Sequence, residues 1–340
     1  MASIVARVYR NQMVESVHYG DWVIVNQEGK IIASQGDPGL KTFFRSAAKP
    51  IQALPVVEQG AADHFGFNDE ELAVMCASHN GEPEHLAAVS SILAKIGLDQ
   101  TALQCGVHPP RHPGQLHLLI RTGAEPSELH NNCSGKHAGM LALCVYHGWD
   151  LDGYTAPGHP LQQMVLSYIS EFCDAAEDTI NLGIDGCGVP VFGLSITQMA
   201  LGWARLADPS RFSPQRVKAV ERIRKAMGSH PHLVAGSNRL CTDLLKAFRS
   251  HGLVAKSGAE AVYCIAMPDR GWGLALKIAD GSSRPVAPVV LAILNQLGYS
   301  GDRNILDQYQ PSVIRNHHQQ PVGEIVPDLS EAKFERVVNQ

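Results

Sequence analysis

The chain has 340 residues, of which 45% are hydrophobic and 18% are charged, and its formal net charge is −5 at pH 7. This length allows a large buried core, and the composition is that of a soluble globular protein, as one big domain or two closely packed ones. The chain has no run of lysine and arginine and no apolar stretch near the ~20 residues that span a bilayer, so nucleic acid and membrane are excluded as expected partners.

The N-terminus and the cysteines both predict a cytoplasmic protein. Residues 1–7 lack the basic region, the apolar stretch and the cleavage site of an export signal. The eight cysteines are scattered without the paired spacings of a small secreted scaffold. We therefore expect most of them to be free thiols in the core.

The first expected elements are a β-hairpin and a helix. Residues 22–25 and 30–33 are β-forming runs around a turn that contains glycine. A helix should then begin near Ser46, with its apolar side formed by Ile51, Leu54 and Val57. Pro55 should kink or end this helix.

The start of this helix carries the first candidate catalytic pair. Ser46 and Lys49 are three residues apart, so one helical turn brings both side chains onto the same face. A serine hydroxyl attacks a carbonyl carbon only if a base takes its proton, and a desolvated neutral lysine can do so. The same S-x-x-K pattern recurs at Ser330 and Lys333, so the spacing alone is not specific.

The middle of the chain should be mainly helical. A capping-box pattern at residues 68–71 predicts a short helix that ends just before Ser78-His79-Asn80. Residues 105–128 are rich in proline, histidine and glycine and predict an irregular segment. Other helices are expected over about 82–96, 160–172, 194–206, 214–228 and 239–248, and residues 131–140 should lead into an apolar helix through 141–145.

The C-terminal part should supply three strands, over residues 253–256, 262–266 and 272–278, and a helix from about 286 to 297. The tail should be an irregular arm with one strand near 322–325. These elements predict an α/β fold of the α+β type, with a mainly antiparallel sheet flanked by helices. We expect a single catalytic unit over 1–340, with a helical region (about 46–250) between an N-terminal hairpin (about 5–35) and C-terminal strands (about 253–280).

Lys256-Ser257-Gly258 completes a set of three ordered motifs. S-x-x-K, S-x-N and K-[ST]-G in this order are typical of serine acyl-transfer enzymes of the penicillin-binding type. Two lysines in one pocket would lower the pKa of each other. We expect Lys49 to serve Ser46 and Lys256 to serve Ser78, one pair making the acyl-enzyme and the other relaying protons.

Asn80 and two cysteines leave alternatives open. The Asn80 amide can cap a turn or hold a substrate carbonyl. Cys133 and Cys187 lie in glycine-rich segments, and with Lys136 or His137 they can bind zinc. Buried reduced thiols are the commoner fate of such cysteines.

The chain resembles the rhizobial-type L-asparaginases, a family distinct from the bacterial two-threonine and the plant-type asparaginases. The resemblance runs from about Val5 to Ile325. It is carried by five motifs, at residues 45–50, 76–82, 131–137, 185–188 and 256–260. The one departure is Ser257, where the family pattern has threonine, and both residues offer a hydroxyl.

The resemblance implies a fold similar to serine β-lactamases and glutaminases, a homodimer, and hydrolysis of L-asparagine to L-aspartate and ammonia. It implies Ser46 as nucleophile with Lys49, and Ser78 with Lys256 as the second pair. It also implies a zinc ion that tunes substrate binding and does no hydrolytic chemistry. The zinc ligands would be Cys133, Lys136 and Cys187, supported by Asp185, and the expected substrate contacts are Arg45, Asn80 and His137.

Two other classes of function fit the same motifs. The chain can be another serine acyl-transfer enzyme, acting on glutamine or on β-lactams. A methylene of difference in a pocket changes binding by only about 1–3 kcal/mol, so the sequence does not separate asparagine from glutamine. The chain can also be a catalytically idle zinc-binding protein that kept the fold.

Overall fold

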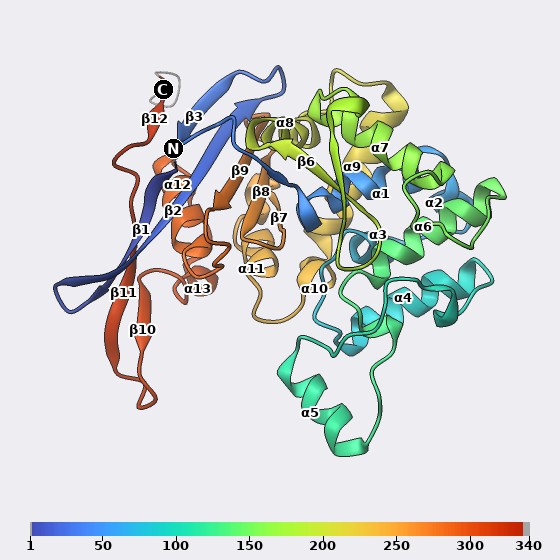
Figure 1. The fold of residues 1–340 in the computed structure, drawn as a ribbon, viewed down its shortest axis with the longest axis horizontal. Helices are drawn as coiled ribbons and strands as arrows, with labels where there is room; N and C mark the ends of the chain where they lie inside the picture. The colour runs from blue at the N-terminus through green and yellow to red at the C-terminus, as the bar shows by residue number, and fades with distance from the viewer. Residues whose placement is uncertain (1, 336–340) are drawn as a thin grey trace. The chain divides into compact units, whose positions relative to one another are not determined.

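The structure is a computed structural model that describes residues 2–335. The chain forms two compact units (Figure 1). Unit 1 contains Met1–Thr42, Leu194–Asp208 and Asp243–Gln340, and unit 2 contains Phe43–Gly193 and Pro209–Thr242. That the whole of 1–340 acts as a single catalytic unit stays a prediction, and its residues 1 and 336–340 lie outside the described part.

Unit 1 is built on an antiparallel sheet in the order β10-β11-β1-β2-β9-β8-β7, with β3 paired to β2 and β12 paired to β3. The strands are β1 Ser3–Arg10, β2 Met13–Asn26, β3 Ile31–Gln35, β7 Val254–Ser257, β8 Val262–Met267, β9 Trp272–Ile278, β10 Ser312–Arg315, β11 Pro321–Pro327 and β12 Lys333–Phe334. The N-terminal strands β1 and β2 lie between the C-terminal strands β11 and β9. The predicted mainly antiparallel sheet is therefore confirmed.

Helices of unit 1 pack on this sheet. Helix α8 (Ile196–Ala207) contacts β2, β8 and β9, and α12 (Val286–Gln296) contacts β11. A Cβ atom on Gly273 would lie 2.1 Å from the carbonyl oxygen of Ala200, so only glycine lets α8 approach β9 so closely. The remaining helices are α11 Leu240–Ala247, whose first residues belong to unit 2, and α13 Arg303–Leu306.

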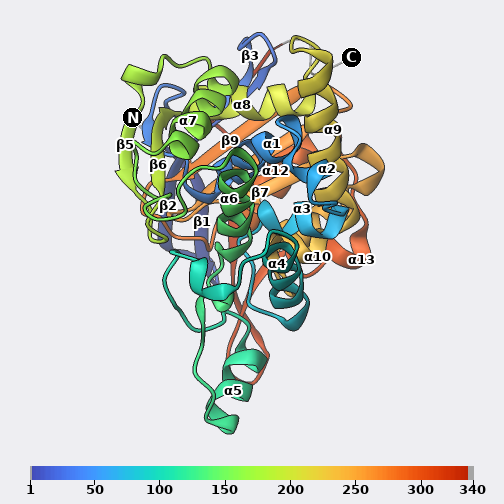
Figure 2. The ribbon, with the colours of Figure 1, turned by 90° about the vertical axis from the view of Figure 1, so that its right-hand side faces the viewer.

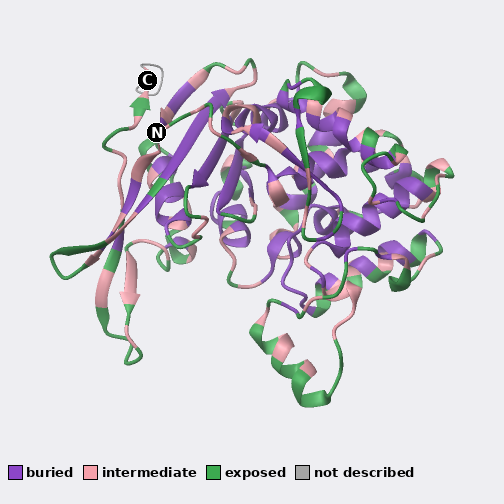
Figure 3. Ribbon diagram, in the orientation of Figure 1, coloured by how far each residue is buried: buried purple, intermediate pink, exposed green. Residues whose placement is uncertain are grey.

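Unit 2 is mainly helical, as expected. Its helices are α1 Lys49–Glu58, α2 Ala61–His64, α3 Asp69–Met75, α4 Pro83–Lys95, α5 Pro113–Thr122, α6 Ser134–His147, α7 Pro160–Cys173, α9 Pro214–Ser229 and α10 Pro231–Ala235. Helix α1 packs against α6, α7 and α9 (Figure 2) and is almost entirely buried (Figure 3). Strands β5 (Asn181–Ile184) and β6 (Pro190–Ser195) form a hairpin, and β6 also pairs with β4 (Lys41–Phe43).

Two local predictions about α1 and α3 had different outcomes. The capping box is confirmed, because the Asn68 side chain accepts from the Glu71 N–H and the Glu71 carboxylate accepts from the Asn68 N–H. Pro55 does not end α1, which continues to Glu58. Proline in a helix interior costs about 3 kcal/mol, and we attribute its tolerance here to the burial of α1 among its neighbours.

The prediction that 105–128 is wholly irregular was wrong, because α5 lies inside it. The helix has local start and stop signals: the His112 side chain accepts from the Gln115 N–H, Pro113 occupies the first turn, and Gly123 ends the helix at φ +65°. None of its residues is buried (Figure 3). His112 and Pro113, which suggested an irregular segment, therefore form the start of a helix.

The predictions of a strand in the tail and of free cysteines in the core are also confirmed. The strand predicted near 322–325 is confirmed as part of β11, and β10 pairs with it. All eight cysteines lie in the described part of the chain, and all are free and buried, as expected. Among residues 2–335, no helix is both long and apolar enough to cross a membrane.

Candidate functional site

Ser46 and Lys49 lie where a 3-10 turn (Arg45–Ala48) passes directly into α1. Ser46 is half-buried, and its hydroxyl makes no hydrogen bond within residues 2–335. Lys49 is 1% exposed. Its amine donates to the Ala77 carbonyl oxygen at 2.5 Å and to the Ser78 hydroxyl at 3.1 Å. The structure thus joins the first lysine to the second predicted serine.

The surroundings of Lys49 favour its neutral form. Desolvation lowers the pKa of this amine, and the nearby charge of Lys136 acts in the same direction. The negative charge of Cys133 opposes both effects, and its sulfur lies 3.2 Å from the Lys49 nitrogen. The net shift is downward, so more of the amine is available as a base at neutral pH than for an exposed lysine.

The segment after α3 holds Ser78 in place through backbone and histidine contacts. The Ser78 N–H donates to the Val234 carbonyl oxygen at 3.0 Å. The next residue, His79, accepts from the Gly81 N–H and pairs through Nε2 with the Ser134 hydroxyl at 2.9 Å. Desolvation lowers the pKa of His79 well below its ordinary value. His79 is therefore neutral and positions the segment, a role that the sequence motif did not reveal.

Two sulfurs and two amines meet beside this serine. Lys136, on α6, donates to the Cys187 sulfur at 3.0 Å, and Lys49 contacts Cys133. A hydrogen bond from Cys187, and then the charges of the two lysines, lower the pKa of Cys133 well below its ordinary value. The same hydrogen bond raises the pKa of Cys187. These opposite shifts favour the thiolate form of Cys133 and the thiol form of Cys187.

Lys136 and Asp185 carry opposite charges in this cluster. Desolvation lowers the pKa of the Lys136 ammonium, but its electrostatic interactions with Cys187 and Cys133 outweigh this effect, so the pKa is raised overall. Desolvation likewise acts against the Asp185 carboxylate, but Lys136, the Gly186 N–H and Arg45 lower its pKa overall. The predicted zinc ligands and their predicted supporting carboxylate therefore lie in one connected set of contacts.

Arg45 contacts Asp185 rather than open solvent. Its Nε and Nη2 both lie 3.1 Å from Oδ1 of Asp185. The Arg45 backbone has φ +52°, a left-handed conformation that is strained for an arginine and that often marks functional sites. Because Asp185 already neutralises this guanidinium, Arg45 is poorly suited to bind the carboxylate of a substrate.

The other two expected substrate contacts are tied into the protein. The Asn80 amide donates to the Ser237 carbonyl oxygen at 3.0 Å and accepts from Arg239 at 2.7 Å. His137 is fully buried, and its Nδ1 lies 2.7 Å from the Tyr154 hydroxyl. The Nε2 atom of His137 has no hydrogen-bond partner in the described part of the chain, so it can still meet a ligand.

Lys256 belongs to unit 1, whereas the ten other predicted site residues belong to unit 2. It lies on β7, opposite Cys264 of β8, and is fully buried. Its amine donates to the Ser257 carbonyl oxygen at 2.8 Å. The assignment of Lys256 to Ser78 stays a prediction that rests on the K-S-G motif.

A second cluster of possible metal ligands was missed from the sequence. Suitable atoms of Glu82, His85 and His232 lie within 4.8 Å of one another. Both His85 nitrogens are already used, because Nδ1 accepts from the Glu82 N–H and Nε2 donates to the His232 carbonyl oxygen. A metal ion bound to His85 would have to break one of these hydrogen bonds.

Gly135 explains how α6 brings Lys136 to this site. A Cβ atom at Gly135 would lie 2.1 Å from the Val74 carbonyl oxygen, at the end of α3.

We expect Gly135→Ala to lower the free energy of unfolding by about 1–3 kcal/mol, because the backbone of α3 or α6 must move to make room for the added methyl group. Gly228→Ala is the control, since this helical glycine has nothing within 4 Å. It should gain about 0.5–1 kcal/mol. Urea unfolding measures both, and equal effects would contradict the packing role.

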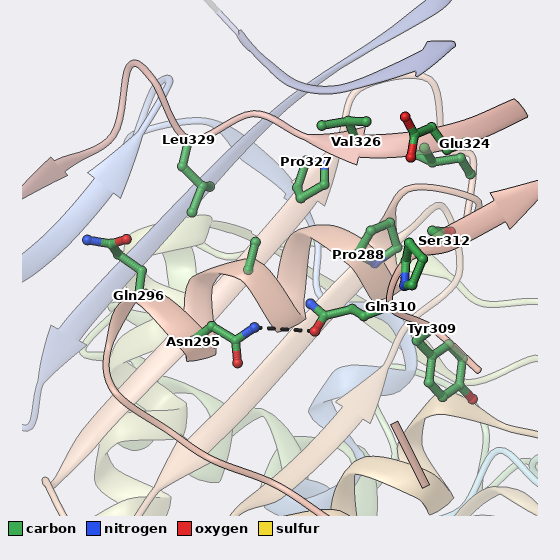
Figure 4. A pocket seen from close by; sticks show the side chains of 13 residues that line it. Pro288, Asn295, Gln296, Tyr309, Gln310, Ser312, Glu324, Val326, Pro327 and Leu329 are labelled. Atoms are coloured by element: carbon green, nitrogen blue, oxygen red, sulfur yellow. Dashed lines mark hydrogen bonds between the residues drawn. The ribbon is translucent and has the colours of Figure 1, made fainter. Parts of the chain in front are cut away.

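A separate cavity in unit 1 contains none of the predicted site residues. It has a volume of about 680 Å³ and is lined by α12 together with residues of the β10 and β11 region (Figure 4). Its side chains include Asn295, whose amide donates to Gln310, and a single carboxylate, Glu324. The candidate catalytic groups, including Lys256 of unit 1, therefore do not line this cavity.

Comparison with known proteins identifies a family for this chain. A family model described as L-asparaginase II matches residues 6–327. No curated protein matches the chain. The crystal structure of Mglu in its native form is 13% identical over 83% of this chain, which spans 65% of the Mglu chain, at a TM-score of 0.36. A β-lactamase from Mycobacterium bovis is 13% identical, with 82% of this chain and 94% of that chain covered and a TM-score of 0.41. These TM-scores are low, and the fold class rests on the strand order of the sheet itself.

Proposed function

The chain belongs to the L-asparaginase II family, and on this basis we propose that it hydrolyses L-asparagine to L-aspartate and ammonia through a serine acyl-enzyme. One observation carries the proposal. A desolvated lysine, Lys49, donates a hydrogen bond to the Ser78 hydroxyl from the same helix start that presents Ser46. A serine hydroxyl beside an amine of lowered pKa is the arrangement that nucleophilic catalysis needs.

In the proposed first half-reaction, the Ser46 oxygen attacks the side-chain amide carbon of L-asparagine. The hydroxyl proton passes to the neutral amine of Lys49, and the amide nitrogen leaves as ammonia after it takes up a proton. The Ser78 hydroxyl, in contact with Lys49, is the relay for that proton. The product of this half-reaction is an ester between Ser46 and the aspartyl group.

In the proposed second half-reaction, water attacks the same carbon. The Lys49 amine and the Ser78 hydroxyl take a proton from the water, and a proton is returned to the Ser46 oxygen as its ester bond breaks and L-aspartate is released. By the K-S-G motif, Lys256 is proposed as the second amine, serving Ser78.

A zinc ion is the proposed cofactor, held by Cys133, Lys136 and Cys187. Two sulfurs and a nitrogen, with Cys187 linked to both Lys136 and Cys133, are a donor set that fits zinc. When bound, the ion would supply a fixed positive charge that tunes substrate binding. Asp185, held by Arg45, would support the ligands.

Zinc binding should depend on pH and on the two cysteines. Lys136 and Cys187 must lose their protons to act as ligands, and their pKa values are raised, so zinc affinity should fall as the pH falls. Cys187→Ser should weaken zinc binding by more than about 100-fold, since even outer partners of metal ligands contribute about 10–100-fold.

Metal analysis after dialysis against chelators measures this effect. Cys144→Ala is the matched control, because Cys144 is a buried thiol on the same helix as Lys136. Desolvation raises the pKa of Cys144 to about 12. Equal zinc content in both variants would contradict the assignment.

The function itself is tested by ammonia release from L-asparagine and L-glutamine at neutral and mildly alkaline pH, with Ser46→Ala as the blank. Release from asparagine that rises with pH and is absent from the blank is the expected result. Faster release from glutamine would make the chain a glutaminase. No release from either amide would overturn the proposal.

The homodimer and the cytoplasmic location are also proposals. The dimer is implied by the family resemblance, and a monomer mass in analytical ultracentrifugation would contradict it. The location is supported by the absence of any disulfide among the eight free cysteines. Fractionation of cells that express the protein would test it.

A further inference from the structure

Arg111 and Arg239 come from two segments that meet at Asn80. Arg239 donates to the Asn80 side-chain oxygen at 2.7 Å. The residue after Arg111, His112, donates its N–H to the Asn80 carbonyl oxygen at 3.0 Å. The loop before His112 also packs closely against the segment that contains Ser78 and Asn80, because a Cβ atom at Gly81 would lie 2.8 Å from the Cβ atom of Pro110. Both arginines are therefore fixed to the segment that carries Ser78.

Neither guanidinium is paired with a carboxylate within residues 2–335. Arg239 bonds only to the neutral Asn80 amide, and Arg111 is exposed and makes no hydrogen bond or ion pair there. Five other arginines lie in an ion pair with a carboxylate: Arg7, Arg10, Arg45, Arg216 and Arg222. Arg111 and Arg239 have no such partner among residues 2–335.

The two guanidiniums act on each other and on the candidate site. Arg111 is exposed as a whole residue, but desolvation of its guanidinium, followed by the charge of Arg239, lowers its pKa, while the negative charge of Cys133 opposes the shift. Like charges in proximity are unfavourable unless an anion lies between them. The guanidinium fork matches a carboxylate with two parallel hydrogen bonds, which makes a carboxylate the best-suited anion.

The dimensions suit an α-amino acid. Three carbon–carbon bonds of about 1.5 Å separate the amide carbon of asparagine from its carboxylate carbon, so the two lie within roughly 4 Å. Ser78 and Asn80 are two residues apart, at most about 7 Å between Cα atoms. An amino acid whose carboxylate is held beside Asn80 can therefore reach the Lys49–Ser78 pair with its amide.

We propose that Arg111 and Arg239 form the subsite that binds the α-carboxylate of the amino-acid substrate. This inference rests on the proposed amidohydrolase function and names the group by which the site would recognise its substrate. Asn80 then acts as a positioning residue that orients Arg239, and Arg45 is left to hold Asp185.

The test compares two substrates that differ in the carboxylate. L-Asparagine carries it, and 3-aminopropanamide keeps the amide and the amine but lacks it. In Arg111→Gln and in Arg239→Lys, kcat/KM for L-asparagine should fall about 10–100-fold, chiefly through KM, as for the loss of one charged hydrogen-bonding partner. The rate with 3-aminopropanamide should change less than about twofold.

Arg121→Gln is the matched control, because Arg121 is an exposed arginine at the end of α5, remote in sequence from the motif segment. It should leave both substrates unaffected. An equal loss with both substrates would indicate a merely structural role and overturn the subsite, as would an unchanged KM for L-asparagine. Thermal melting of each variant checks that it is folded.

Failure of the proposed function gives a different result. If the wild-type protein releases no ammonia, calorimetric titration with L-aspartate replaces the assay. Binding to the wild-type protein that is lost in Arg111→Gln but kept in Arg121→Gln would support the carboxylate subsite without any activity. No binding to the wild-type protein, or equal binding to all three proteins, would overturn it.

Discussion

Replacing Ser46 with alanine is expected to reduce kcat for L-asparagine on the order of 10³-fold or more, because no oxygen remains to form the acyl bond. The variant should fold normally, since the Ser46 hydroxyl makes no hydrogen bond in the described structure. A loss of rate without a loss of stability is therefore the combined expectation. Steady-state ammonia release and a thermal melt measure the two quantities.

The control for this variant is Ser330→Ala. Ser330 and Lys333 repeat the S-x-x-K spacing in the tail, where the Ser330 hydroxyl donates to Asp328 and is exposed. This variant should keep the wild-type rate. Acid quenching during turnover, followed by peptide mass spectrometry, should place the aspartyl adduct on Ser46. An adduct on Ser78 instead would exchange the roles of the two serines, which the Lys49–Ser78 hydrogen bond makes a chemically reasonable alternative.

Replacing Lys49 with methionine is expected to lower kcat by about 10²–10⁴-fold, the usual contribution of a positioned general base. Methionine has a similar length and removes the amine from a fully desolvated position. It leaves the Ala77 carbonyl oxygen without the Lys49 donor, so some loss of stability is expected as well. Rates are therefore compared at a temperature where the melt shows the variant to be folded.

The pH profile separates a base from a structural lysine. A base works only when it is deprotonated, so the wild-type rate should rise with pH through the pKa of Lys49. Because desolvation lowers that pKa, the rise should occur below the ordinary lysine value of 10.5. Lys49→Met should lose the rise, whereas Lys225→Met, which removes an exposed lysine paired with Asp69, should keep it. An identical pH profile for wild type and Lys49→Met would rule Lys49 out as the base.

Local signals were enough for most elements of the fold. The Asn68 capping box and the apolar strand runs that became β7, β8 and β9 depend on neighbours a few residues away, which a sequence displays directly. Where local signals conflicted, the sequence misled: the prolines near Pro113 open a helix, and Pro55 does not end the helix that contains it.

The sequence by itself determined which chemical groups are available: Ser46, Lys49, Ser78, Cys133 and their motifs. Only the tertiary structure decided which groups meet. The contacts of Lys49 with Ser78, of Arg45 with Asp185 and of Arg239 with Asn80 join residues 29, 140 and 159 positions apart. Spacing along a helix or strand predicts neighbours only within a turn or two. Contacts at such separations depend on how helices pack, and here on single atoms such as the missing Cβ of Gly135 that lets α6 reach α3.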